Sequence, residues 1–148
     1  MKNVVLAVIT IVTMVFTSCK KDSTEPTQLS VSQMLTAKTW QVEEVTDHMG
    51  GNIDKLYKRG ANNNQDDYSL VRQQFKTDGT ITYTDEFGIT GKDGLWELQD
   101  NNKKIKLNLP SMGLSVVCED VTVTANSFSY KLTYPGNSYV LFTFSPLP

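Results

Sequence analysis

The stretch Phe75-Lys76-Thr77-Asp78-Gly79-Thr80-Ile81-Thr82-Tyr83 decides which fold this chain can adopt. In its second half, β-branched and aromatic residues alternate in a way that is typical of a strand with one buried face. The Asp-Gly pair predicts a two-residue hairpin turn, because both residues tolerate the positive φ that a type I′ turn requires. We therefore expect two antiparallel strands that are joined at Asp78 and Gly79.

The same kind of pattern continues through most of the chain. Polar and apolar residues alternate at every position of Lys104-Ile105-Lys106-Leu107-Asn108-Leu109, as expected for a sheet with one face exposed to solvent. We expect strands at residues 40–46, 68–76, 80–85, 94–98, 104–109, 114–124, 128–134 and 138–144. Residues 53–58 could form a further short strand, and His48 falls in the turn that we expect before them.

One helix precedes these strands in the prediction. Ser30 and Gln33 fit a capping box at the start of residues 30–37. The predicted fold class is therefore all-β, with about eight antiparallel strands after a short N-terminal helix. Closely spaced strands of this kind hide both sheet edges when they close into an up-and-down barrel. An open β-sandwich is the alternative.

The start of the chain has the pattern of an export signal. Lys2 is followed by a mostly apolar run at residues 4–16, which is shorter than the roughly 20 residues of a membrane-spanning helix. The Thr-Ser-Cys-Lys-Lys-Asp sequence that ends at Asp22 resembles the signals of Bacteroidota lipoproteins, which implies that Cys19 is lipidated. The alternative is an ordinary signal peptide with Cys19 as an unmodified thiol.

These features divide the chain into three parts. We expect a lipoprotein signal peptide at residues 1–18, a flexible tether at residues 19–29 and a β-barrel domain at residues 30–148. The predicted location is the bacterial cell envelope, anchored in the outer membrane through an acylated Cys19, with the periplasmic or surface face left open. Lipidation of Cys19 would leave Cys118 without a partner for an intramolecular disulfide.

Charge narrows the choice of partners. The formal charge is −2, and removal of Lys2 with the signal would make it −3. An acidic chain without a basic cluster is a poor candidate for binding nucleic acid, so we expect no such partner.

The order of the strand motifs resembles a known family. Trp40 in the first strand, the Phe75–Tyr83 hairpin and Gly94-Leu95-Trp96-Glu97-Leu98 are together similar to the small lipocalin-like lipoproteins of Bacteroidota. That resemblance implies a barrel that either holds a small apolar ligand or is filled by its own side chains. The side chains expected to point inward, as a core or as a ligand wall, are Trp40, Phe75, Tyr83, Trp96, Leu98, Leu107, Phe128, Tyr130 and Phe142.

Catalytic patterns are missing from the sequence. His48 has no neighbouring ligand at the spacing of a zinc site, and we find no nucleophile elbow and no phosphate-binding glycine loop. We therefore expect a protein without enzymatic activity, cofactor or metal.

Two functions from different classes remain open at this point. One is a carrier or sensor that binds a small apolar ligand in the barrel or at its mouth. The other is an envelope interaction module that contacts a protein or a glycan through loops such as residues 60–67 and 87–94. Exposure of Tyr57, Phe87 or Tyr139 would favour the second function.

Overall fold

A computed structural model describes residues 29–148 of the chain. The predicted signal peptide, Cys19 and the tether up to residue 28 lie outside the described residues. The helix in the described part is α1 (Val31–Thr36), and a single 3₁₀ turn, η1 (Pro110–Met112), joins two strands. The strands are β1 (Thr39–Met49), β2 (Asn52–Lys58), β3 (Arg72–Phe75), β4 (Thr80–Thr84), β5 (Thr90–Gln99), β6 (Lys104–Leu109), β7 (Leu114–Val123), β8 (Phe128–Tyr134) and β9 (Ser138–Pro146).

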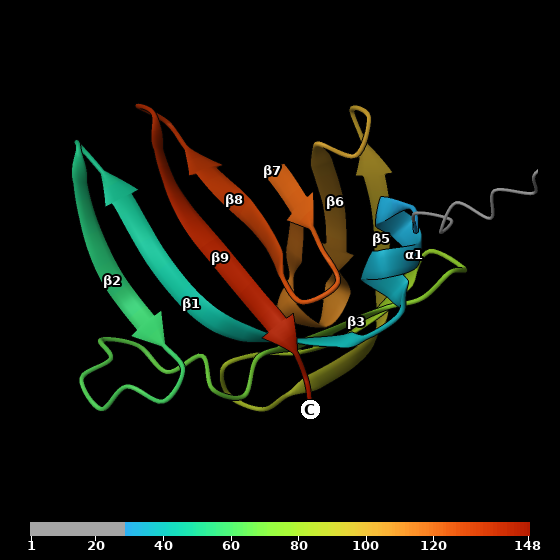
Figure 1. Ribbon diagram of the computed structural model, residues 1–148, viewed down its shortest axis with the longest axis horizontal. Helices are drawn as coiled ribbons and strands as arrows, with labels where there is room; N and C mark the ends of the chain where they lie inside the picture. Colours follow the sequence, from blue (N-terminus) through green and yellow to red (C-terminus); the bar gives the residue numbers. More distant parts are fainter. Residues whose placement is uncertain (1–28) are drawn as a thin grey trace, which may run out of the picture.

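Eight of these strands close into an antiparallel barrel, which confirms the predicted fold class (Figure 1). Each strand from β3 to β8 pairs with the next one along the chain, and β1 pairs with both β3 and β9 to complete the circle. Each of these eight strands therefore has a neighbour on both sides, which leaves none of them as an edge strand. The open sandwich is thereby set aside.

The ninth strand, β2, lies outside this circle. The first half of β1 pairs with β3, from Thr39 to Gln41, and its second half pairs with β2, from Glu44 to Met49. β9 runs along both halves of β1. The sheet therefore extends beyond the barrel on one side, where β2 and the far ends of β1, β8 and β9 form a wing (Figure 1).

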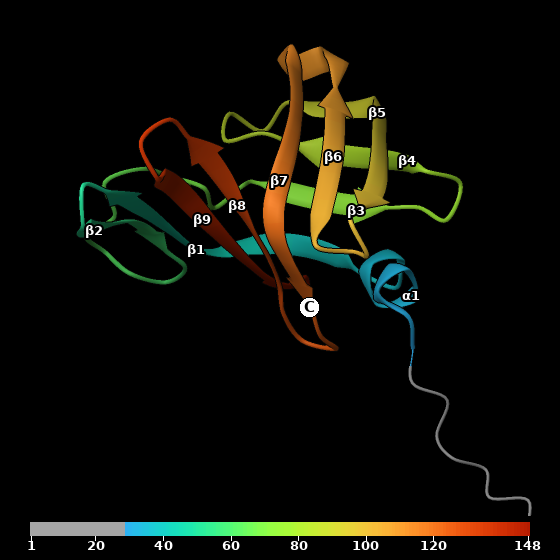
Figure 2. The same ribbon diagram turned by 90° about the horizontal axis from the view of Figure 1, so that it is seen from above.

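The helix α1 covers one end of the barrel, which we call the closed end (Figure 2). Ser30 and Gln33 make both hydrogen bonds of the predicted capping box, at 3.2 and 2.8 Å. Leu35 is fully buried, and its carbonyl accepts a 2.8 Å hydrogen bond from the indole Nε1 of Trp40. That bond satisfies a polar group of Trp40 that is buried with the rest of the ring.

Aromatic side chains fill the barrel behind the helix. The ring of Phe128 lies 5.7 Å from that of Trp40, 5.5 Å from that of Phe75 and 5.0 Å from that of Phe144. The buried core runs from Leu35 to Phe144, and all nine strands pair within residues 39–146. Residues 29–148 thus contain both a complete core and a closed sheet, which are the properties of a part that folds on its own.

Three local predictions are wrong. The strand expected at residues 68–76 spans only Arg72–Phe75, because the chain turns before it, where the N–H of Val71 donates to the carbonyl of Tyr68 at 3.1 Å. The turn between β3 and β4 has three residues, because Lys76 pairs with Thr80 through a 2.9 Å hydrogen bond and only Gly79 has a positive φ, of 83°. This is a type I turn followed by a left-handed glycine, and it replaces the predicted two-residue type I′ turn. His48 lies in β1 and not in a turn, because β1 continues to Met49.

Candidate ligand-binding site

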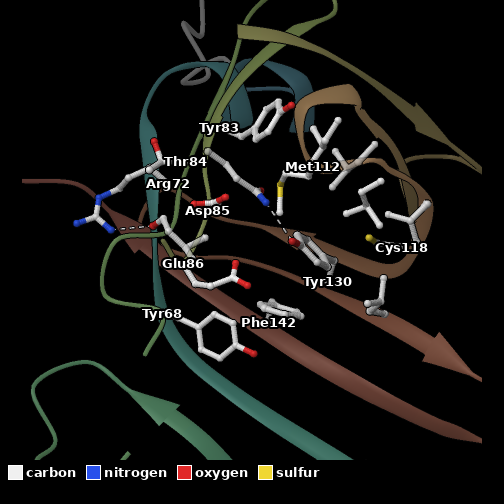
Figure 3. A pocket seen from close by; sticks show the side chains of 17 residues that line it. Tyr68, Arg72, Tyr83, Thr84, Asp85, Glu86, Met112, Cys118, Tyr130 and Phe142 are labelled. Atoms are coloured by element: carbon white, nitrogen blue, oxygen red, sulfur yellow. Dashed lines mark hydrogen bonds between the residues drawn. The ribbon is translucent and has the colours of Figure 1, made fainter. Parts of the chain in front are cut away.

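The end of the barrel opposite α1 holds a cavity of about 130 Å³ (Figure 3). We call this the open end. Its wall consists mainly of apolar side chains from β6, β7, β8 and β9, and its mouth is formed by loop residues before β3, after β4 and between β6 and β7. The lining residues are Tyr68, Val71, Arg72, Gln73, Tyr83, Thr84, Asp85, Glu86, Leu107, Leu109, Met112, Leu114, Val116, Cys118, Tyr130, Leu132 and Phe142.

Strand alternation explains most of this wall. In β6 the inward residues are Ile105, Leu107 and Leu109, of which the last two line the cavity. Leu107 pairs directly with Val116 of β7. Residues opposite each other in an antiparallel pair share a face, so both side chains line the interior.

Tyr83 is held against the wall and does not fill the space. Its hydroxyl donates a 3.1 Å hydrogen bond to Asp93 and accepts a 2.9 Å bond from the backbone N–H of Ser111. The ring lies directly over Gly91, where a Cβ atom would come within 2.3 Å of the ring carbon Cζ. Glycine at position 91 therefore makes room for a ring that would otherwise lean into the cavity.

A buried polar pair sits among the apolar lining residues. Gln73 is only 6% exposed, and its Nε2 donates a 3.1 Å hydrogen bond to the hydroxyl oxygen of Tyr130, drawn as a dashed line in Figure 3. Within the described residues, Oε1 of Gln73 has no hydrogen-bond partner. Buried polar atoms are rarely left unpaired, because losing water without a replacement is unfavourable.

Charged residues are confined to the mouth of the cavity. The guanidinium of Arg72 points away from it and donates to the carbonyls of Ser69 and Val71, both at Nη1, at 2.8 and 2.7 Å (Figure 3). The other charged lining residues are the carboxylates Asp85 and Glu86. The electrostatic environment of the mouth is therefore acidic, with its one lining cation turned outward.

Cys118 lines the cavity as an unreactive thiol. It is buried, and burial raises its pKa to about 12. A thiol of such high pKa is almost entirely protonated at neutral pH, so it is a poor nucleophile and behaves as a small apolar side chain.

The predicted inward residues separate into three groups. Tyr83, Leu107, Tyr130 and Phe142 line the cavity, whereas Trp40, Phe75 and Phe128 belong to the packed closed end. Trp96 and Leu98 are partly buried at the edge of the core. The ring of Trp96 meets that of Phe75 edge-on at 5.4 Å, and its Nε1 donates to the carbonyl of Lys76 at 2.9 Å.

Gln73, Met112 and Cys118 line the cavity without having been predicted as site residues. For Gln73 a signal was present in the sequence, because it lies two residues before the inward Phe75 and a strand alternates with period two. Met112 comes from the 3₁₀ turn between β6 and β7, where no such periodicity applies.

Among the described residues, few features indicate a metal site or another kind of functional site. His48 shares a 3.0 Å hydrogen bond with Thr46 and stacks on Tyr139 at 4.3 Å. Among residues 29–148, no three His, Cys, Asp or Glu side chains gather in a way that could hold a metal ion. No helix in this described part is long and apolar enough to cross a membrane.

Comparison with known proteins gives no family for the chain. No family model matches it. A search of curated proteins also found no match.

Proposed function

We propose that this protein is a non-catalytic, lipocalin-like envelope lipoprotein that binds a small apolar ligand at the open end of its barrel. The observation that carries this proposal is the cavity of about 130 Å³, whose wall is almost entirely apolar. An apolar cavity of about 150 Å³ engineered into another protein stays dry and binds benzene. The space here is therefore of the size that admits one aromatic ring or the end of an aliphatic chain.

A pair of neighbouring valines provides the test of binding. Val116 lines the cavity, whereas Val117 lies on the outer face of β7 and is 42% exposed. We expect Val116→Phe to fill the cavity and abolish binding of toluene to residues 29–148, as measured by chemical-shift changes in NMR titration. Val117→Phe should bind toluene like the wild type. Equal binding by both variants, or failure of the wild type to bind toluene and every other small apolar probe, would contradict the proposal.

Anchoring by Cys19 is a separate part of the proposal, supported by the sequence alone. We expect the full chain expressed in a bacterium of the Bacteroidota to incorporate a clickable palmitate. Cys19→Ala should abolish the label, and Cys118→Ala should retain it, because Cys118 is buried in the barrel. An unlabelled wild-type chain would remove the lipoprotein interpretation without affecting the cavity.

The second candidate, an interaction module, is favoured by one feature of the loops. Phe87 is 78% exposed and Ile89 is 61% exposed in the connection between β4 and β5, beside the mouth. Exposed apolar residues that gather in one place are a common sign of a binding surface. Tyr57 is buried and Tyr139 stacks on His48, so of the three aromatic residues considered only Phe87 supports this candidate strongly. Pull-down from envelope extracts with Phe87→Ser as the control would test it.

A further inference from the structure

We infer that the cavity selects a neutral apolar ligand with one hydroxyl group, such as a phenol or an alcohol. This inference rests on the proposed function, since it concerns the ligand of the same cavity. It is carried by the Gln73–Tyr130 pair, the only buried polar side chains that meet on the otherwise apolar wall of the described barrel.

The pair presents one free acceptor and one free donor. Oε1 of Gln73 has no partner among the described residues, although the side chain is nine-tenths buried. The Tyr130 hydroxyl accepts from Gln73, so its own proton is left to donate. Burial raises the pKa of Tyr130, which keeps that proton in place. A hydroxyl group both donates and accepts one hydrogen bond, and therefore satisfies both partners at once.

Other ligand chemistries fit this pair less well. A hydrocarbon would leave Oε1 of Gln73 and the hydroxyl proton of Tyr130 without partners, which is unfavourable because both have lost their hydration. A carboxylate can only accept, so it cannot pair with Oε1 of Gln73. Its charge would also enter an apolar cavity whose mouth carries Asp85 and Glu86, while the guanidinium of Arg72 is turned outward. Burying an uncompensated charge is strongly unfavourable.

The register of the strands gives the direction in which the ligand enters. Gln73 pairs with Trp40 on one side and with Tyr83 on the other, so it lies where the aromatic core of the closed end begins. The hydroxyl end of the ligand would therefore lie deepest. Its apolar body would extend toward the mouth, where Leu70 and Phe87 are exposed.

Matched pairs of small probes test this selectivity. Residues 29–148 labelled with ¹⁵N would be titrated at pH 7.5 with p-cresol and toluene, which differ by the hydroxyl, and with 1-hexanol and hexanoate, which differ by the charge. We expect p-cresol to bind about tenfold more tightly than toluene, because a hydroxyl that pairs two buried groups is worth roughly that factor. The side-chain amide signal of Gln73 should shift with p-cresol. Hexanol should bind more tightly than hexanoate.

Two adjacent glutamines provide the control. Gln73→Leu removes the free acceptor, and we expect it to abolish the preference so that toluene binds at least as tightly as p-cresol. Gln74→Leu makes the same change on the exposed face of β3 and should retain the tenfold preference. Tyr130→Phe is a second variant at the site and should also lose the preference, while the spectra of all variants report whether the barrel is intact.

The outcomes separate this inference from the proposed function. If toluene binds the wild type as tightly as p-cresol, or hexanoate binds more tightly than hexanol, the inference is wrong and the apolar cavity stands. A wild-type preference that survives in Gln73→Leu would also overturn it. If none of the probes binds the wild type, both the inference and the proposed function fail.

Discussion

At the closed end of the barrel, Trp40, Phe75 and Phe128 are all at most 1% exposed, and their rings are packed against one another beneath α1. At the open end, the same strands β3 and β8 place Gln73 and Tyr130 on their inner face, and a cavity of about 130 Å³ remains. Both ends are built from the same strands with the same alternating pattern. The comparison shows that alternation determines which residues point inward, whereas ring size and a covering helix determine whether the interior is filled.

The largest difference between the two ends should appear when a phenylalanine is removed from each. Phe128→Ala would leave a cavity in a fully packed site, and we expect it to lower the free energy of unfolding by about 4 kcal/mol. Phe142→Ala removes a partly buried ring next to existing space, so it should lower that free energy by less than about half as much. Urea unfolding of both variants measures the difference. Equal losses would show that the open end is packed as tightly as the closed one.

A methyl group at position 91 would test how the open end is kept open. Gly91→Ala places a Cβ atom against the ring of Tyr83, so we expect the ring to be displaced toward the cavity and the free energy of unfolding to fall by about 2 kcal/mol. In a Tyr83→Ala background the same substitution should be nearly neutral, because the clashing ring is absent. A double-mutant cycle measures this coupling, and additive effects would contradict the explanation.

The buried thiol of Cys118 predicts a loss of stability in alkali. Because its pKa rises from about 9 to about 12 on folding, the unfolded chain loses the thiol proton first, and the protein becomes less stable as the pH increases through that window. In Cys118→Ala we expect the free energy of unfolding to fall less steeply with pH than in the wild type, by about 1 kcal/mol per pH unit. Urea unfolding between pH 9 and 11 measures both slopes. Parallel slopes for the wild type and the variant would mean that the thiol is solvated.

The smallest expected effect is the change in stability of the ligand-free protein when the Gln73–Tyr130 pair is replaced. Replacing both members, as in Gln73→Leu with Tyr130→Phe, removes one unpaired acceptor and one unpaired donor, so we expect the ligand-free protein to gain about 1 kcal/mol of stability. Each single variant leaves its partner unpaired and should be less stable than the double one. Thermal unfolding of the four proteins is the measurement, and a destabilised double variant would show that the pair serves the fold itself.

Much of the barrel could be predicted from the sequence, because period-two alternation survives wherever a strand is regular. Lys104 to Leu109 is the clearest case, since Ile105, Leu107 and Leu109 are all buried as predicted. The capping box at Ser30 was equally readable, because it depends only on residues three apart. Both signals are local, and local signals persist regardless of the tertiary fold.

Features that depend on distant strands could not be predicted. Irregularities in register interrupt the alternation between Val42 and Glu44, and again between Glu119 and Thr122. Tyr57 is buried because the ring of Tyr68 lies 5.9 Å from its own ring. The two residues are joined by a loop whose sequence shows no helix or strand pattern. Likewise, nothing in the sequence of β1 indicates that its first half pairs with β3 and its second half with β2.

The position of α1 has a consequence for how the molecule would be oriented. The chain reaches the barrel through α1, and the cavity opens at the opposite end. Any attachment made through residues that precede Leu29 would therefore lie at the closed end, remote from the mouth of the cavity. The attachment would leave that mouth unobstructed, so a small molecule could enter or leave while the protein stays attached.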